Sequence, residues 1–103
     1  MNNAKLLKVL RRGDSQYDNY EVCQRKLDYL DSKDEFDIYE VAAGLGYTSS
    51  YVRKKFNFYG LKGIRKPFRG KMETTFYPKK IVKKLMSYDP DIVTRVKIIR
   101  GEI

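Results

Sequence analysis

Apolar residues recur at helical spacing in the N-terminal third of the chain. Leu6, Leu7 and Leu10 predict a short amphipathic helix over residues 3–12, which Gly13 ends. The next apolar residues follow at intervals of three and four and predict a second helix over about 15–31; they are Tyr20, Cys23, Leu27 and Leu30. Residues 31–37 are polar, and we expect a loop there.

A third helix is predicted to begin at Asp37. Asp37 and Glu40 stand three residues apart, as the N-cap and N3 positions of a capping box do. The helix should bury one apolar stripe, made of Ile38, Val41, Ala42 and Leu45. Gly46 is expected to end it, because a residue with positive φ is needed there and glycine adopts that conformation without cost.

A fourth helix is predicted over about 49–59, with Thr48 or Ser49 as its cap. Val52 and Phe56 should face inward. Three consecutive cations follow Val52, and they cannot all be buried. This helix should therefore show a cationic face to solvent.

The pattern changes after Gly60 and Gly63. Residues 64–69 and 73–77 predict two short strands that pair around Gly70–Lys71 as a basic hairpin. Pro78 suits the first position of a fifth helix over 78–87, which would bury Ile81, Val82 and Leu85.

The last segment gives two conflicting signals. Ile92, Val96 and Ile99 keep helical spacing after Asp89–Pro90, which favours a helix. Six of the ten residues from 91 to 100 are β-branched, which favours a strand. We prefer the helix. The predicted fold is thus mainly α with a small β-hairpin, in one domain over 1–103: a helical extension over 1–36, a core over 37–87 and a C-terminal segment over 88–103.

Composition argues against several classes of protein. The chain has no histidine and one cysteine, so nucleophiles paired with histidine and histidine-ligated metal sites are excluded. We expect no enzyme activity, no cofactor, no metal and no small-molecule ligand. No apolar run approaches the roughly 20 residues that cross a bilayer. A lone cysteine fits a reducing compartment, and the expected location is the cytoplasm, away from membranes.

Charge is segregated along the sequence. The net charge is +9, yet residues 13–47 carry nine anions and three cations. Residues 48–86 carry twelve cations and one anion, Glu73. Segregated positive charge indicates a polyanionic partner, most often nucleic acid.

The third and fourth helices fit a helix-turn-helix. Such a pair needs a small residue where the helices cross and a positive-φ residue in the turn, and Ala42 and Gly46 meet these needs. The outward positions that would face a major groove are Thr48, Ser49, Ser50, Arg53 and Lys54. For Tyr51, core packing and a DNA contact are equally open.

The motif residues continue beyond this pair. Arg53 stands seven residues after Gly46, followed by Gly60–Leu61, Pro67-Phe68-Arg69, and Tyr77 with Val82 and Leu85 at +5 and +8. Over about residues 38–86 the chain resembles the winged helix-turn-helix of the MerR family and its small excisionase-like relatives. It departs from that pattern at Glu73-Thr74-Thr75, where the family has a wing arginine, and at Ile81, where the family usually has an acidic residue.

The resemblance implies a winged helix-turn-helix that binds double-stranded DNA. Wing and backbone contacts would come from Lys62, Arg65, Lys66, Arg69 and Lys71, and further phosphate contacts from Lys79 and Lys80. The expected function is a sequence-specific transcriptional regulator, a repressor of phage or mobile-element type that acts by occupying its operator. Modules of this size often bind as homodimers, because one recognition helix contacts few base pairs. The alternatives are an excisionase-like DNA-bending factor, an RNA-binding module and an inhibitor that binds another protein.

Overall fold

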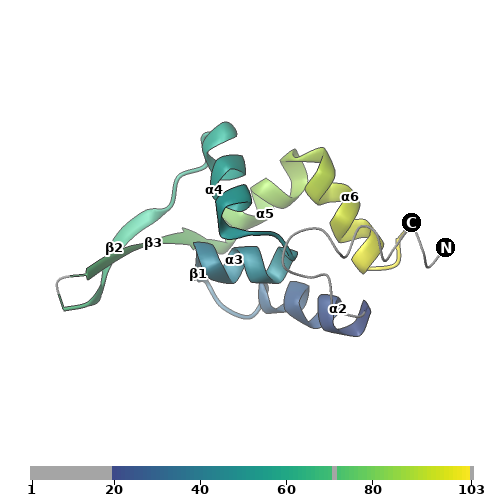
Figure 1. Ribbon diagram of the computed structural model, residues 1–103, viewed down its shortest axis with the longest axis horizontal. Coiled ribbons are helices and arrows are strands. Elements are labelled where there is room, and N and C mark those ends of the chain that lie inside the picture. Colours follow the sequence, from purple (N-terminus) through teal and green to yellow (C-terminus); the bar gives the residue numbers. More distant parts are fainter. Residues whose placement is uncertain (1–19, 71, 103) are drawn as a thin grey trace.

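Helices make up most of the structure, a computed structural model that describes residues 20–70 and 72–102 (Figure 1). The described residues form five helices and a three-stranded antiparallel sheet. The elements are α2 (Tyr20–Tyr29), β1 (Glu35–Asp37), α3 (Ile38–Leu45), α4 (Ser49–Phe58), β2 (Ile64–Arg69), β3 (Met72–Pro78), α5 (Lys79–Tyr88) and α6 (Pro90–Ile99). The helix predicted over 3–12 and the first residues of the one predicted over 15–31 lie outside the described residues.

The predicted capping box at the start of α3 is confirmed. The Asp37 carboxylate accepts a hydrogen bond from the Glu40 N–H at 2.8 Å, and the Glu40 carboxylate accepts one from the Asp37 N–H at 3.1 Å. The helix ends at Gly46, which has φ of 75°. The N–H groups of Gly46 and Tyr47 donate to the carbonyl of Ala42 and close the last turn.

The start and end of α4 also follow the sequence. Thr48 is the N-cap, and its Oγ1 accepts a hydrogen bond from the Tyr51 N–H at 3.2 Å. Gly60, with φ of 66°, follows the C-terminal end of the helix. A turn of three residues, 46–48, therefore separates α3 from α4.

The sheet contains a strand that the sequence did not predict. The hairpin of β2 and β3 is confirmed, with Gly70 in its turn, but the expected loop over 31–37 is wrong for Glu35–Asp37. These residues form β1, which pairs with β3 so that Phe36 lies opposite Tyr77. Three residues are too few to show a period of two, and the pairing partner lies some 40 residues away in the sequence. The hairpin projects away from the helices (Figure 1).

The C-terminal region is helical throughout its two predicted elements. Helix α5 begins at Lys79, one residue later than predicted, because Pro78 still pairs with Glu35 as the last residue of β3. Residues 90–99 form a helix, as preferred from the spacing. Asp89 caps this helix and Pro90 stands at its first position. Burial of its apolar stripe outweighs the β propensity of the branched residues.

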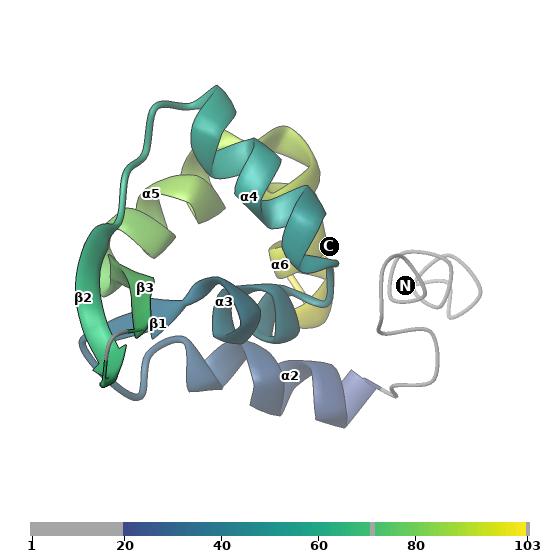
Figure 2. The same ribbon diagram turned by 60° about the vertical axis from the view of Figure 1, so that its left-hand side comes forward.

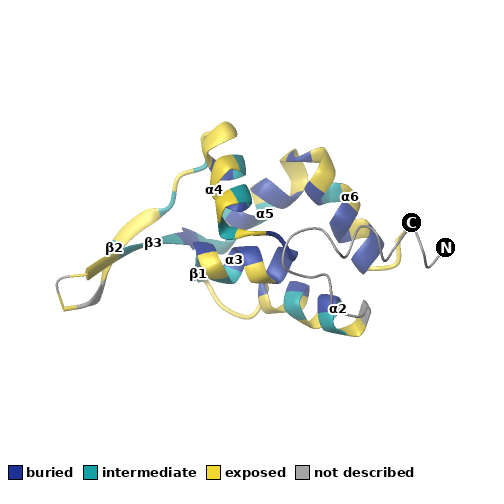
Figure 3. Ribbon diagram, in the orientation of Figure 1, coloured by how far each residue is buried: buried dark blue, intermediate teal, exposed yellow. Residues whose placement is uncertain are grey.

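The core lies where the helices face one another (Figure 3). Helix α3 lies between α2 and α4 (Figures 1 and 2). Every apolar residue predicted to be buried in α3 is buried, as are Val52, Phe56, Val82 and Leu85, while Ile81 is only partly buried. None of the helices described here combines the length and apolar character that crossing a membrane requires.

Gly44 allows the side chain of Leu30, the residue after α2, to pack closely against α3. A Cβ at Gly44 would lie 2.6 Å from the Cγ of Leu30, a fully buried side chain. We expect Gly44→Ala to lower the free energy of unfolding by about 1–3 kcal/mol through overpacking, even though alanine favours the helix by about 1 kcal/mol. Urea denaturation measures the change. The added substitution Leu30→Ala should relieve the overpacking in a double-mutant cycle, and a Gly44→Ala variant more stable than the parent would contradict the contact.

Candidate nucleic-acid interface

The turn between α3 and α4 is held by stacked aromatic rings. The rings of Tyr47 and Tyr51 stack with centroids 4.5 Å apart and an angle of 25° between planes. Tyr47 is buried and Tyr51 is partly buried against the core. The structure thus places the Tyr51 ring in the packing between the turn and the first turn of α4.

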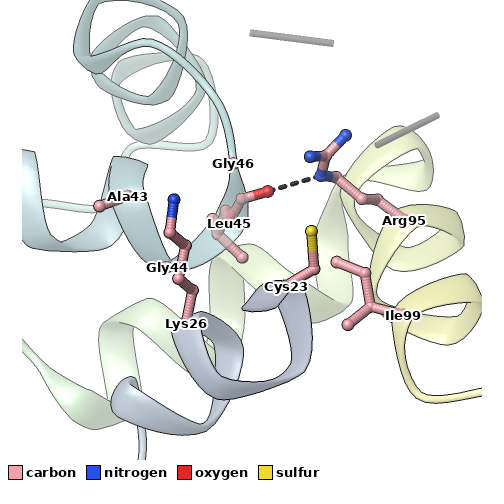
Figure 4. Close-up of a pocket in the computed structure, with 8 residues that line it drawn as sticks. All are labelled: Cys23, Lys26, Ala43, Gly44, Leu45, Gly46, Arg95 and Ile99. Carbon is pink, nitrogen blue, oxygen red and sulfur yellow. Dashed lines mark hydrogen bonds between the residues drawn. The ribbon is translucent and has the colours of Figure 1, made fainter. Parts of the chain in front are cut away.

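A buried arginine from α6 supports the same turn. Arg95 is 1 % exposed, and its Nε donates a hydrogen bond to the carbonyl of Leu45 at 2.6 Å (Figure 4). Its guanidinium lies 4.8 Å from the centroid of the Tyr47 ring. Because a cation at a helix C-terminus meets the negative end of the helix dipole, the charge of Arg95 stabilises the end of α3. The same guanidinium also stabilises the turn through its cation–π contact with Tyr47.

Arg95 was not among the residues predicted from the sequence to matter. The signal was present, because Arg95 lies three residues after Ile92 and four before Ile99, on the stripe predicted to be buried. A cation at such a position indicates a buried partner, since an isolated buried charge is costly.

Asp89 joins the N-terminus of α6 to α4. Its side chain is almost fully buried and accepts hydrogen bonds from the Ile92 N–H at 3.1 Å and the Tyr59 hydroxyl at 3.1 Å. Lys55 forms an ion pair with it at 2.8 Å. Burial alone would raise the pKa of Asp89, but these hydrogen bonds outweigh burial and hold the pKa below its ordinary value. Lys55, the inward-facing residue of the three consecutive cations, is therefore engaged in an ion pair within the protein.

We expect stability to fall in acid. The pKa of Asp89 and the pKa of Glu40 both lie below their ordinary values; in Glu40, burial would raise the pKa, but hydrogen bonds from Lys33, Tyr29 and the Asp37 N–H outweigh it. Carboxylates with depressed folded-state pKa values stabilise the fold above the unfolded-state pKa, and that stability is lost as pH falls through the folded-state pKa. Urea denaturation from pH 7 to pH 3 should show constant stability down to about pH 5 and a decline below it. Asp89→Asn should flatten the decline; an unchanged slope would contradict the role of Asp89.

One face of α4 stays open to solvent. Its exposed positions follow a helical stripe and are Ser50, Arg53, Lys54, Asn57 and Phe58. Neither Arg53 nor Lys54 forms an ion pair with any other part of the chain that the structure describes. Three predicted contact residues thus share this face, together with two that sequence reasoning missed, Asn57 and Phe58. Helical spacing places Asn57 and Phe58 on the same stripe as Arg53 and Lys54. They were not predicted, because the predicted contacts were confined to the first half of the helix.

The remaining predicted residues of this helix lie at its start. Thr48 is exposed and its hydroxyl caps α4, while Ser49 is only partly exposed. Both stand at the positive end of the helix dipole.

The base of the hairpin packs directly on α4. The rings of Phe56 and Tyr77 are nearly parallel, at 8°, with centroids 4.0 Å apart. Burial raises the pKa of Tyr77, and the positive charge of Arg53 opposes that rise. This packing fixes the hairpin relative to the open face of α4.

Weak ion pairs engage two of the predicted hairpin cations. Arg65 pairs with Glu73 at 3.3 Å, and Lys66 pairs with Glu35 at 2.6 Å. All four side chains are at least one-third exposed, so each pair contributes about 1 kcal/mol or less. Lys62 is exposed. Lys71 and the side chain of Arg69 lie outside what the structure describes.

The two predicted cations of α5 differ in their surroundings. Lys80 is exposed, whereas the Nζ of Lys79 lies 3.4 Å from the carbonyl oxygen of Asp31. Lys83 pairs with the Asp31 carboxylate at 2.5 Å. Two lysines of α5 thus contact Asp31, in the acidic segment after α2. Lys79 is therefore engaged within the fold and is not part of the open face of α4.

A small gap between α2, the end of α3 and α6 is bordered by Cys23, Arg95 and Ile99 (Figure 4) and has no room for a water molecule. Within residues 20–70 and 72–102, no group of three or more cysteine or acidic side chains is arranged to hold a metal ion.

The chain matches no protein-family model, no curated protein and no solved structure.

Proposed function

We propose that this protein is a sequence-specific double-stranded DNA-binding protein of the winged helix-turn-helix type, with α3 and α4 as the helix pair and β2–β3 as the wing. The observation that carries the proposal is the open face of α4, where Arg53 and Lys54 are exposed and form no ion pair with residues 20–70 or 72–102, beside a projecting cationic hairpin. Exposed, unneutralised cations on one face are what a polyanion binds.

The dimensions of α4 support a major-groove site. With its side chains an α-helix is about 10–12 Å across, so a major groove about 12 Å wide admits one; the ten residues of α4 give it a length of about 15 Å. Ser50 and Arg53 would face base edges, and Arg53 has the fork of donors that guanine O6 and N7 accept. Thr48 and Ser49, at the positive end of α4, suit a backbone phosphate.

The hairpin would contact the flanking backbone. Arg65 and Lys66 are held by exposed ion pairs that a phosphate can replace at little cost. Such contacts fix the position of the protein on the duplex and make binding depend on salt, whereas base contacts give sequence preference.

Binding of this kind regulates transcription by occupancy. A protein seated on a site that overlaps a promoter excludes polymerase and acts as a repressor. Binding as a homodimer would double the number of base pairs contacted and so raise specificity.

Selection from a pool of randomised duplexes tests the proposal. We expect the full chain to enrich one sequence class, and the affinity for the enriched duplex to fall with salt. About four phosphate contacts would give a slope of log affinity against log salt of about −4. Failure to enrich any duplex over the starting pool would refute sequence-specific DNA binding.

A further inference from the structure

Phe58 is the most exposed large apolar side chain among the described residues, at 78 %. It lies four residues after Lys54, on the same stripe of α4, and Asn57 lies four residues after Arg53. The open face of α4 therefore begins with the hydroxyl of Ser50 and the cations of Arg53 and Lys54. One turn later it ends in the amide of Asn57 and the phenyl ring of Phe58.

Neighbouring rings hold the Phe58 side chain in place. Its ring meets the Tyr59 ring edge-on, with centroids 4.9 Å apart. Tyr59 packs in turn against Tyr88, at 5.9 Å, and its hydroxyl donates to the buried Asp89. The phenyl group is thus supported from the fold side and presents its free surface to solvent. A supported, exposed ring of this kind is suited to an apolar contact with a partner.

The surrounding charge restricts what that partner is. Lys54 is exposed on the same stripe, so a second copy of this face would bring like charges together. A nucleic-acid duplex has the opposite charge, and the apolar group that it presents in the major groove is the 5-methyl of thymine. The neighbouring pattern that an asparagine amide matches is the N6 and N7 edge of adenine.

We propose that Asn57 and Phe58 specify A·T base pairs at the end of the binding site that the C-terminal turn of α4 contacts. Phe58 covers a thymine methyl, and the amide of Asn57 bonds to an adenine edge. This inference rests on the proposed function and adds to it the base composition of one part of the target.

Chemically altered bases test the two contacts separately. In the duplex enriched by selection, each thymine is replaced in turn by uracil, which lacks only the methyl group. At one position we expect the chain to lose about four-fold in affinity, the value of one buried methyl group, and Phe58→Ala to lose nothing further. Replacement of one adenine by 7-deazaadenine should cost the chain about ten-fold and the Asn57→Ala variant nothing further.

Two further variants control for changes in folding. Phe58→Leu keeps an apolar group and should keep its sensitivity to uracil. Tyr39→Ala removes another exposed ring, 66 % exposed on α3, and should keep the full response to both altered bases.

The outcomes separate the inference from the proposed function. A chain that enriches no duplex would overturn both. If the chain enriches a duplex but binds the uracil and 7-deazaadenine forms of that duplex as tightly as the unmodified duplex, the inference alone is overturned. Loss of affinity in Phe58→Ala together with a halved stoichiometry would also overturn it, because Phe58 would then lie between two protein copies.

Discussion

Arg95→Ala is expected to destabilise the fold by about 3 kcal/mol, the largest effect on stability that we predict for a single substitution. The substitution removes a buried side chain, leaves the Leu45 carbonyl without its 2.6 Å hydrogen bond, and takes the guanidinium away from the Tyr47 ring. The relief of a buried charge offsets part of this cost. Thermal unfolding should show a fall in melting temperature of more than about 10 °C.

Two other replacements distinguish the parts of the Arg95 contact. Arg95→Lys keeps the charge but loses the planar fork and the Nε–H donor, so it should be intermediate in stability. Arg95→Met keeps most of the volume and should cost less than alanine. If Arg95→Ala melts within about 2 °C of the parent, Arg95 does not support the turn between α3 and α4.

Arg53→Ala is expected to weaken binding to the enriched duplex by about 10- to 100-fold, the value of a bidentate contact to guanine. The side chain is exposed and forms no ion pair in the described part of the chain, so its loss should leave the melting temperature unchanged. Fluorescence anisotropy at fixed salt measures the affinity. Sequence preference should also relax at one base pair.

Arg25→Ala is the matched control for Arg53→Ala. Arg25 is an exposed arginine of α2, on the acidic part of the chain, and its loss removes the same charge from another face. It should reduce affinity by less than about three-fold. Equal losses in the two variants would mean that only net charge matters, and the major-groove role of Arg53 would then be wrong.

Local signals in the sequence predicted the parts of the fold that depend on neighbouring residues. The capping box of Asp37 and Glu40, the positive φ of Gly46 and the hairpin around Gly70 each depend on a few adjacent positions. Such features need no knowledge of the rest of the chain. Strand β1 was missed because its only support is pairing with β3, a contact distant in sequence.

The candidate site was predicted only in part for a similar reason. The exposed cations of α4 follow from the run that begins at Arg53, but the separation of Lys55 from its neighbours depends on Asp89, 34 residues later. Arg95 became visible only once α6 was placed against the end of α3. Helical spacing places Phe58 on the outer stripe of α4, although phenylalanine is usually buried, and the structure shows its side chain exposed.

The central claim is that the open face of α4 binds a specific DNA duplex. A competition titration tests it most directly, with the full chain bound to the labelled enriched duplex at about 150 mM salt. The competitors are the unlabelled duplex, a scrambled duplex and single-stranded and double-stranded RNA of equal length. We predict that the enriched duplex competes at least about 1,000-fold better than the scrambled duplex and either RNA. Competition by either RNA that equals or exceeds that of the enriched duplex would contradict the claim.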